Sequence, residues 1–101
     1  MDLVSVRQQA DKCIIKFNDD LIGSISDDFQ SAYMNNKNAK YFELDFGSVS
    51  RIDSKGFGML IDMHDQVGSE EDIEKITITN ASDSVKQLLE GLHIDRVLRI
   101  V

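Results

Sequence analysis

The residues best suited to chemistry lie together at positions 53–58, which read Asp-Ser-Lys-Gly-Phe-Gly. They stand where a polar connection gives way to an apolar helical pattern, so we expect them at the N-terminus of a helix. The first N–H groups of a helix lack intrahelical partners and carry partial positive charge, which favours an anion. A phosphate on Ser54 would accept N–H bonds from Gly56 and Phe57 and lie beside Asp53. The pattern thus indicates a hydroxyl that can be phosphorylated.

Ser54 also has a simpler interpretation, as the N-cap of that helix with Asp53 as an acidic loop residue. Serine is among the commonest N-cap residues, so spacing alone does not choose between a cap and a modification site. Gly56 and Gly58 leave the backbone uncovered at this point. A kinase or another protein can therefore approach it closely.

Two methionines extend this candidate site along the same helix. Met59 and Met63 are four residues apart, at the margin of the expected apolar stripe, where methionine suits either adaptable protein contacts or the core. If that margin is exposed, one docking face is formed by Ser54, Gly58, Met59 and Asp62. A dianion at its edge would weaken binding about 100-fold through repulsion and desolvation.

The other reactive side chains are isolated in the sequence. His64 lies between Asp62 and Asp65, but adjacent helix positions point apart and two further ligands are missing, so we expect no metal site. Neither His64 nor His93 has a paired base, and there is no glycine-rich phosphate loop. Cys13 is the single cysteine and cannot form an internal disulfide. We expect no catalytic residue, no cofactor and no enzyme activity.

Composition narrows the classes of partner. The chain has 11 Lys+Arg against 18 Asp+Glu, a net charge of −7, and no basic cluster, which argues against nucleic acid and anionic membrane surfaces. No apolar run approaches the roughly 20 residues of a membrane-spanning helix, and the first residues lack the pattern of a signal peptide. We expect no membrane insertion, a cytoplasmic location and, from 101 residues, a single domain over 1–101.

Strands and helices alternate along the chain. Short apolar or alternating runs predict strands at 3–6, 12–17, 41–46, 73–79 and 96–101. Helical spacing predicts helices from Ser26 to about residue 34, through the stripe of Phe57, Leu60, Ile61, His64 and Val67, and from Ser82 or Asp83 to about Gly91. This order predicts an α/β fold, with a mixed, mostly parallel sheet of four to five strands. We expect the first strand to pair antiparallel and the helices to pack mainly on one face.

Several segments carry a family resemblance. Residues 42–46, Val49 and residues 52–60 resemble the STAS domain shared by bacterial anti-sigma factor antagonists and sulfate transporter tails. Residues 79–89 are similar to the family's passage from a strand to the last helix, and residues 94–100 to its ending. The resemblance covers nearly the whole chain and implies a small STAS-like α/β domain acting in bacterial signal transduction and transcription regulation.

The resemblance implies partner switching. In anti-sigma factor antagonists the serine at the position of Ser54 is phosphorylated by the cognate anti-sigma kinase, and a metal-dependent protein phosphatase removes the phosphate. The unphosphorylated protein binds an anti-sigma factor or related serine kinase, and phosphorylation releases it. The implied partner-binding residues here are Asp53, Ser54, Lys55, Gly56, Gly58, Met59 and Asp62.

Two positions depart from the family pattern. Lys55 replaces the small residue often found after the phosphoacceptor, and residues 21–25 lack the acid commonly found there. Lys55 can pair with a phosphate or an acidic partner, or can be a solvated first-turn lysine. A ligand-binding or transport accessory STAS subunit is the alternative function. The sequence fixes neither the partner nor the oligomeric state.

Overall fold

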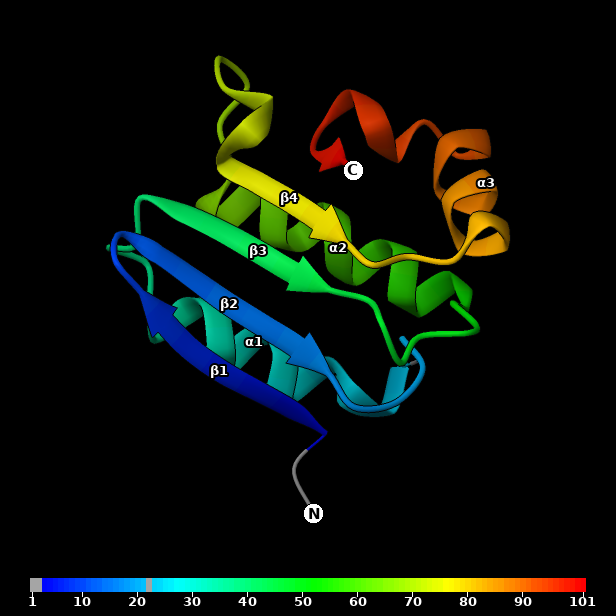
Figure 1. Cartoon of the computed structure of the whole chain (residues 1–101), viewed down its shortest axis with the longest axis horizontal. Coiled ribbons are helices and arrows are strands. Elements are labelled where there is room, and N and C mark those ends of the chain that lie inside the picture. The colour runs from blue at the N-terminus through cyan, green and yellow to red at the C-terminus, as the bar shows by residue number, and fades with distance from the viewer. Residues whose placement is uncertain (1–2, 22) are drawn as a thin grey trace.

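Five strands form one sheet in the order β1-β2-β3-β4-β5 (Figure 1). The computed structural model describes residues 3–21 and 23–101; residues 1, 2 and 22 of the expected 1–101 domain lie outside the described residues. β1 pairs antiparallel with β2, and β2 to β5 pair in parallel. The mixed, mostly parallel sheet confirms the predicted fold class. The strands are β1 (Val4–Gln9), β2 (Lys12–Phe17), β3 (Tyr41–Asp45), β4 (Ile76–Thr79) and β5 (Arg99–Ile100).

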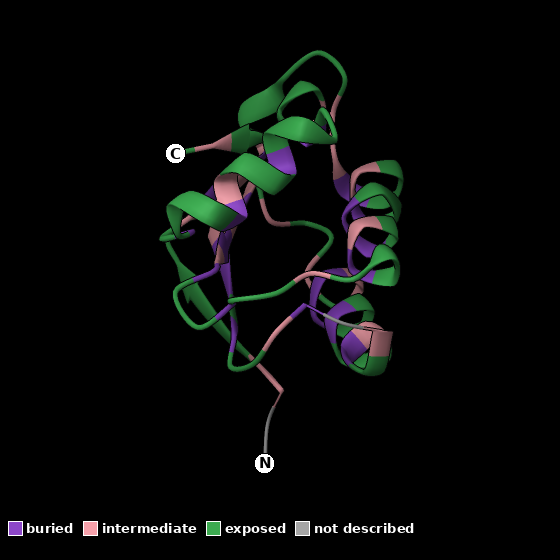
Figure 2. Ribbon diagram, turned by 90° about the vertical axis from the view of Figure 1, so that its right-hand side faces the viewer, coloured by how far each residue is buried: buried purple, intermediate pink, exposed green. Residues whose placement is uncertain are grey.

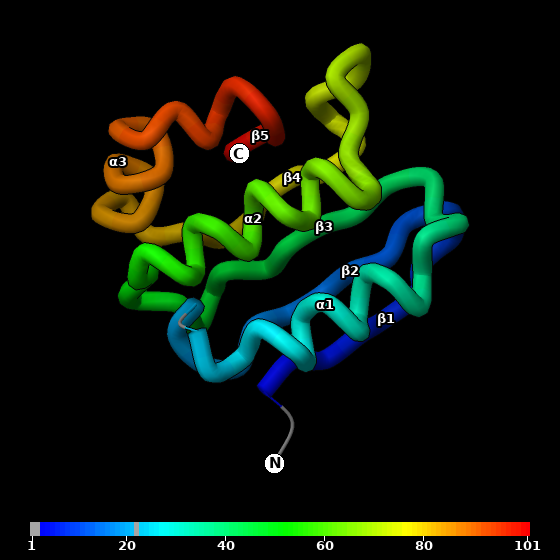
Figure 3. Tube along the Cα trace, turned by 180° about the vertical axis from the view of Figure 1, so that it is seen from behind, coloured from blue at the N-terminus to red at the C-terminus, as the bar shows by residue number. Residues whose placement is uncertain are grey.

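Two helices cover one face of this sheet. α1 (Ser26–Met34) and α2 (Ser54–Val67) lie behind the strands in Figure 1 and in front of them in Figure 3. α3 (Asp83–Gly91) follows β4 and lies apart from the layer of α1 and α2 (Figure 2). The opposite face of the sheet stays open in the centre, so the prediction that helices pack mainly on one face is confirmed. Three short 3-10 turns complete the chain: η1 (Gly23–Ile25), η2 (Ile73–Lys75) and η3 (Ile94–Arg96).

Strand alternation places the core between the sheet and the two helices. Cys13, Phe42 and Ile76 are aligned across β2, β3 and β4, and all three are buried. Phe17 packs against Phe29 of α1, with ring centroids 5.0 Å apart. The purple segments of Figure 2 show this buried layer facing inward from both sides. Each large apolar side chain buried there contributes about 1.5–3 kcal/mol, so the layer holds α1 and α2 on the sheet.

Two predicted strands are shorter than expected. The first residues of the 73–79 run form η2 instead, because the Asp72 carboxylate accepts the N–H of Glu74 and curls the chain before β4 begins. Of the final run, 96–101, only Arg99–Ile100 pairs with β4. The helix predicted from Ser26 does begin at that residue, but η1 leads directly into it, so Ile25 holds the N-cap position without a side-chain bond.

The buried face of α2 differs from the predicted one by a small rotation. The expected stripe ran through Phe57, Leu60, Ile61, His64 and Val67, whereas the buried side chains are Met59, Leu60, Met63 and Val67. Ile61 is 39% exposed and Met59 only 6% exposed. Both sets have helical spacing, so periodicity alone could not choose between them.

The rotation is set where α2 begins. After β2 and β3 end, their connections pair once more: Leu21 and Ile52 form a parallel bridge, with the N–H of Leu21 donating to the Arg51 carbonyl at 3.1 Å. The N–H of Asp53 donates to the Leu21 carbonyl at 3.3 Å. A Cβ added to Gly56 would lie 2.2 Å from that same carbonyl oxygen. Only glycine allows this approach, and the approach fixes which side of α2 faces inward.

Asp20 strengthens the same pair of connections. Its Oδ1 accepts the N–H of Ser50 at 2.8 Å, the Ser50 hydroxyl at 2.9 Å and the N–H of Arg51 at 3.1 Å. The Arg51 guanidinium adds an ion pair at 3.5 Å. The backbone and hydroxyl bonds from Ser50 lower the pKa of Asp20 below its ordinary value of 3.8, because they favour the charged form. Asp20 thus holds the loop that leads into α2.

No helix within the described parts of the chain is long and apolar enough to cross a lipid bilayer. α2, the longest helix, has 14 residues.

Replacing the two glycines of α2 tests the contact with Leu21. Gly56→Ala is expected to lower the free energy of unfolding by about 1–3 kcal/mol, because the new methyl group meets backbone that cannot move aside. Gly58→Ala is the matched control: it has open space within 4 Å and is expected to raise that free energy by up to about 1 kcal/mol. Urea denaturation of both variants measures the difference. Equal changes in the same direction would contradict the proposed contact.

The Asp20 carboxylate is expected to make stability depend on pH. Its pKa is lowered in the folded state, so its contribution is complete above the ordinary value of 3.8 and is lost as the pH falls through the lower folded value. Asp20→Asn should lower the midpoint of thermal unfolding by several degrees at pH 7. Its difference from wild type should shrink below pH 3.8. A difference that persists unchanged into acid would show that charge is not the cause.

Candidate functional site

Asp53 organises the start of α2. It occupies the N-cap, with extended backbone, and its Oδ1 accepts the N–H of Gly56 at 2.7 Å. Its Oδ2 accepts the N–H of Gly23 at 3.3 Å. One carboxylate therefore satisfies an otherwise unpaired donor of the helix and ties the helix to the η1 segment. The negative charge also lies at the positive end of the helix dipole.

Ser54 is consequently the first residue of α2, and the alternative prediction that it is the N-cap is wrong. The N–H groups expected to bind its phosphate are also engaged: Gly56 donates to the Asp53 side chain, and Phe57 donates to the Asp53 carbonyl at 3.1 Å. The physical reason is that Asp53 reaches these donors from one residue earlier. Ser54 is exposed, and among residues 3–21 and 23–101 its hydroxyl forms no hydrogen bond that caps the helix, because Asp53 accepts that bond.

The expected docking residues separate into a surface group and a buried group. Asp53, Ser54, Lys55, Gly58 and Asp62 are all exposed. We call these five residues the α2 surface. Because they recur along one side of the first three turns of α2, a protein partner can contact them together.

Gly56 and Met59 belong to the interior. Gly56 packs on the Leu21 carbonyl, and Met59 is part of the core, so of the two interpretations left open for Met59 the core one is correct, and the prediction that Met59 belongs to an exposed docking face is wrong. Met63 is also fully buried. Ile61, which sequence reasoning placed in the core, is exposed on α2 instead. The rotation set by Gly56 explains both changes, and no local pattern in the sequence signalled them.

Lys55 lies across the η1 segment. A Cβ added to Gly23 would be 2.6 Å from the Lys55 Cδ, so the alkyl chain of Lys55 covers that glycine. Lys55 as a whole remains exposed. Among the residues that the structure describes, Lys55 forms no ion pair. Its ammonium group is therefore available to an acidic group of a partner.

The histidine of α2 lies at the far end of the helix. His64 is half-buried, and its Nδ1 is a buried atom that has no hydrogen-bond partner among the described residues and packs against Gly68. Within residues 3–21 and 23–101, no three His, Cys, Asp or Glu side chains come together to hold a metal ion. Cys13 is buried in the core, and that burial raises the pKa of its thiol.

Similar folds occur among solved structures. A Thermotoga maritima protein, TM1081, described as a candidate anti-sigma factor antagonist, superposes with a TM-score of 0.80 at 19% identity, covering 96% of this chain and 84% of its own. The anti-sigma factor antagonist SpoIIAA in its unphosphorylated form gives 0.69 at 12% identity, covering 97% and 86%. The phosphorylated form of SpoIIAA, a Bacillus cell fate determinant, gives 0.63 at 13% identity, covering 97% and 90%. At these identities the likeness establishes the fold.

Sequence comparison supplies the family. No curated protein matches this chain. The family model of the STAS domain matches residues 4–101, from the first strand to the last residue. The match includes all the segments in which the resemblance was found, within residues 42–60, 79–89 and 94–100. The chain belongs to the STAS domain family.

Proposed function

We propose that this protein is an anti-sigma factor antagonist that acts by partner switching under control of Ser54. The observation that carries the proposal is an exposed serine at the first turn of α2, beside an aspartate that already caps the helix. Because Asp53 performs the structural task, Ser54 can gain or lose a phosphate without unfolding the helix. The unphosphorylated protein binds an anti-sigma factor or related serine kinase through the α2 surface.

Electrostatics supports release on phosphorylation. A phosphoserine carries a charge of about −1.5 to −2 at neutral pH. On Ser54 the phosphate would lie next to the Asp53 carboxylate. The nearby N–H groups of Gly23 and Gly56 already donate to that carboxylate, so few donors remain for the phosphate. A hydrated dianion enclosed in an interface loses its water without full compensation, and it repels any acidic group of the partner. We expect affinity to fall about 100-fold.

The fold has a direct bearing on the class of function. The α2 surface lies on an exposed side of a helix, and it carries two acids, a lysine, a serine and a glycine. Those features suit protein recognition, so we propose a regulator without enzyme activity of its own. A metal-dependent phosphatase would restore the binding form. The alternative, a transport accessory subunit, would bind a permease component independently of Ser54.

Binding and phosphorylation of Ser54 variants test the switch. Titration calorimetry with a purified anti-sigma kinase from the same organism is expected to show binding by wild type and Ser54→Ala. The phosphorylated wild type should bind about 100-fold more weakly. Since Asp53 holds the cap, Ser54→Ala should change the free energy of unfolding by less than about 0.5 kcal/mol. Ser54→Ala that still gains phosphate, or phosphoprotein that binds as tightly as wild type, would refute the assignment.

Gly58 offers a test of the surface that is separate from charge. Gly58→Gln places a side chain in open space above α2, so the fold is retained while close approach of the partner is blocked. We expect at least about tenfold weaker binding, equivalent to roughly 1.4 kcal/mol. Gly91→Gln is the matched control, because Gly91 is also an exposed helical glycine with open space around it, but on α3. Equal weakening of binding in both variants, or no weakening in either, would place the interface elsewhere.

A further inference from the structure

The two edges of the sheet differ in length. β1, at one edge, has six residues, whereas β5, at the other edge, has two. Within residues 3–21 and 23–101, no strand pairs with the outer side of β1, which runs along the border of the sheet in Figure 1. A long edge strand presents a row of unpaired N–H and C=O groups to any other strand that approaches. β1 is therefore the edge that can accept a further strand.

The pairing of β1 with β2 decides which backbone groups are free. The N–H of Asn18 donates to the Leu3 carbonyl at 3.0 Å, so these two residues form a hydrogen-bonded pair at the start of the ladder. Such pairs occur at every second position of an antiparallel ladder. The groups that point away from β2 therefore belong to Val4, Val6 and Gln8, which supply three donors and three acceptors.

The usual features that protect an edge strand are scarce in β1. It contains no lysine, its register with β2 is uninterrupted by a bulge, and the protein has no proline. Lysines, bulges and prolines are the features that commonly prevent edge strands from pairing. The one charged residue of β1 is Arg7. It alternates with Val6, which is aligned with the core residue Ile15, so Arg7 is directed to the side of the sheet opposite α1.

A hollow of about 440 Å³ lies beside this edge, between β1 and α1. Its lining includes Val4 and Val6 of the strand and Ser31 and Ala32 of the helix. Val6 is 44% exposed although its side chain is on the same side of the sheet as the core. A strand added to β1 would cover Val6 and direct every second side chain of its own toward this hollow. Free backbone groups beside such a hollow are what binds an extended segment.

We propose that the occupant of this edge is β1 of a second copy of this chain, paired antiparallel about a two-fold axis at Val6. In that register Val6 lies opposite Val6 of the second copy, and Val4 lies opposite its Gln8. Every outward donor of one strand then meets an outward acceptor of the other. The two five-stranded sheets join into one continuous sheet through an isologous interface.

The charges of α1 favour a second copy at this edge. α1 runs in the same direction as β1, because Asp28 lines the hollow with Val4 near one end, and the Asn36 side chain accepts a hydrogen bond from Gln8 near the other. Across the two-fold axis, the acidic first turn of one α1 lies beside the end of the other. Opposite ends of the two helix dipoles are then neighbours, which is favourable.

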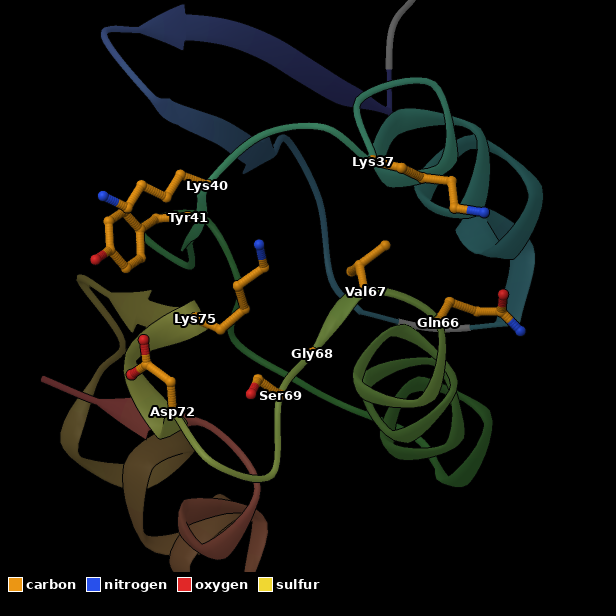
Figure 4. Close-up of a pocket in the computed structure, with 9 residues that line it drawn as sticks. All are labelled: Lys37, Lys40, Tyr41, Gln66, Val67, Gly68, Ser69, Asp72 and Lys75. Atoms are coloured by element: carbon orange, nitrogen blue, oxygen red, sulfur yellow. The ribbon is translucent and has the colours of Figure 1, made fainter.

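Lys37 adds a positive charge at that end of α1. It is exposed, and among the described residues it forms no ion pair. Figure 4 shows its side chain pointing away from the two other lysines drawn there, so it is not held in the depression that those residues line. In the two-fold arrangement Lys37 approaches the acidic turn of the second copy, which contains Asp27 and Asp28. Complementary charges of this kind fix the register of an interface.

The dimer is compatible with the proposed partner switch and does not rest on it. α1 contacts both β1 and α2, and α2 lies on the side of α1 remote from β1 (Figure 3). The α2 surface of each copy therefore stays uncovered. One dimer presents two copies of Ser54 to its partners.

Sedimentation velocity over a series of concentrations tests the dimer. The mass is expected to rise with concentration from 11.4 kDa toward twice that value. Val6→Lys and Val6→Glu each place like charges opposite one another at the two-fold axis, so each variant alone should dimerise at least about tenfold more weakly. An equimolar mixture of the two variants should dimerise again, because opposite charges then face one another. Val6 is exposed, so both variants should stay folded.

Amide hydrogen exchange locates the interface within β1. Protection of the N–H groups of Val4, Val6 and Gln8 should increase with concentration, because these groups gain partners only in the dimer. The N–H groups of Ser5 and Arg7 already donate to β2, so their protection should be the same at every concentration.

Val101→Lys is the matched control, because Val101 is an exposed valine next to the opposite edge strand. It should dimerise as the wild type does, and so should Ser54→Ala. The proposal is overturned by a mass of 11.4 kDa at every concentration, by a dimer that persists in both Val6 variants, or by a mixture of them that stays monomeric. Protection of the three outward amides only when a different protein is added would assign the edge to that protein instead. Each of these results leaves the role of Ser54 unaffected.

Discussion

The approach of α2 to the carbonyl of Leu21 is the constraint on which the rest of the structure depends. That oxygen accepts the N–H of Asp53 and lies so close to Gly56 that a side chain there has no room. The contact sets the rotation of α2 about its axis. From that rotation follow the burial of Met59 and Met63 and the exposure of Ile61. A backbone contact at one end of α2 thus determines which side chains are exposed along the whole helix.

Two carboxylates, of Asp20 and Asp53, hold the connections around this contact. Asp20 orders the loop before α2, and Asp53 caps the helix and binds the η1 segment. Because these two carboxylates satisfy the backbone donors, Ser54 forms no side-chain hydrogen bond that holds this region together within the described parts of the chain. A side chain free of structural duty can be modified at little cost to stability, which is the property that a phosphorylation switch requires. In the proposed switch, the exposed position of Ser54 would keep a phosphate on the outer surface, away from the core.

Charge is distributed unevenly around the single core. The first turns of α2 carry Asp53 and Asp62, with Lys55 as the nearest cation of the α2 surface. The other end of the same helix borders a hollow with three lysines and one aspartate.

Much of the fold could be predicted because it follows from local patterns. Alternation in residues 41–46 placed Phe42, Leu44 and Phe46 on one buried face, and the order of strands and helices predicted a mostly parallel sheet with its first strand antiparallel. Ser82 and the glycine at position 91 bounded α3 as expected. The strand predicted at 73–79 was too long. The Asp72 carboxylate accepts the N–H of Glu74, and this local hydrogen bond favours the η2 turn over an extended strand at residues 73–75.

The sequence by itself determined the elements, their order and the exposed serine motif at the start of α2, because periodicity and capping act over a few neighbouring residues. Only the tertiary structure decided which of two equally periodic stripes on α2 is buried, since that choice rests on Gly56 meeting Leu21, 35 positions earlier in the chain. It also decided that Asp53 rather than Ser54 caps the helix. Contacts between distant segments leave no periodic trace in the sequence, which is why these features emerge only from the folded chain.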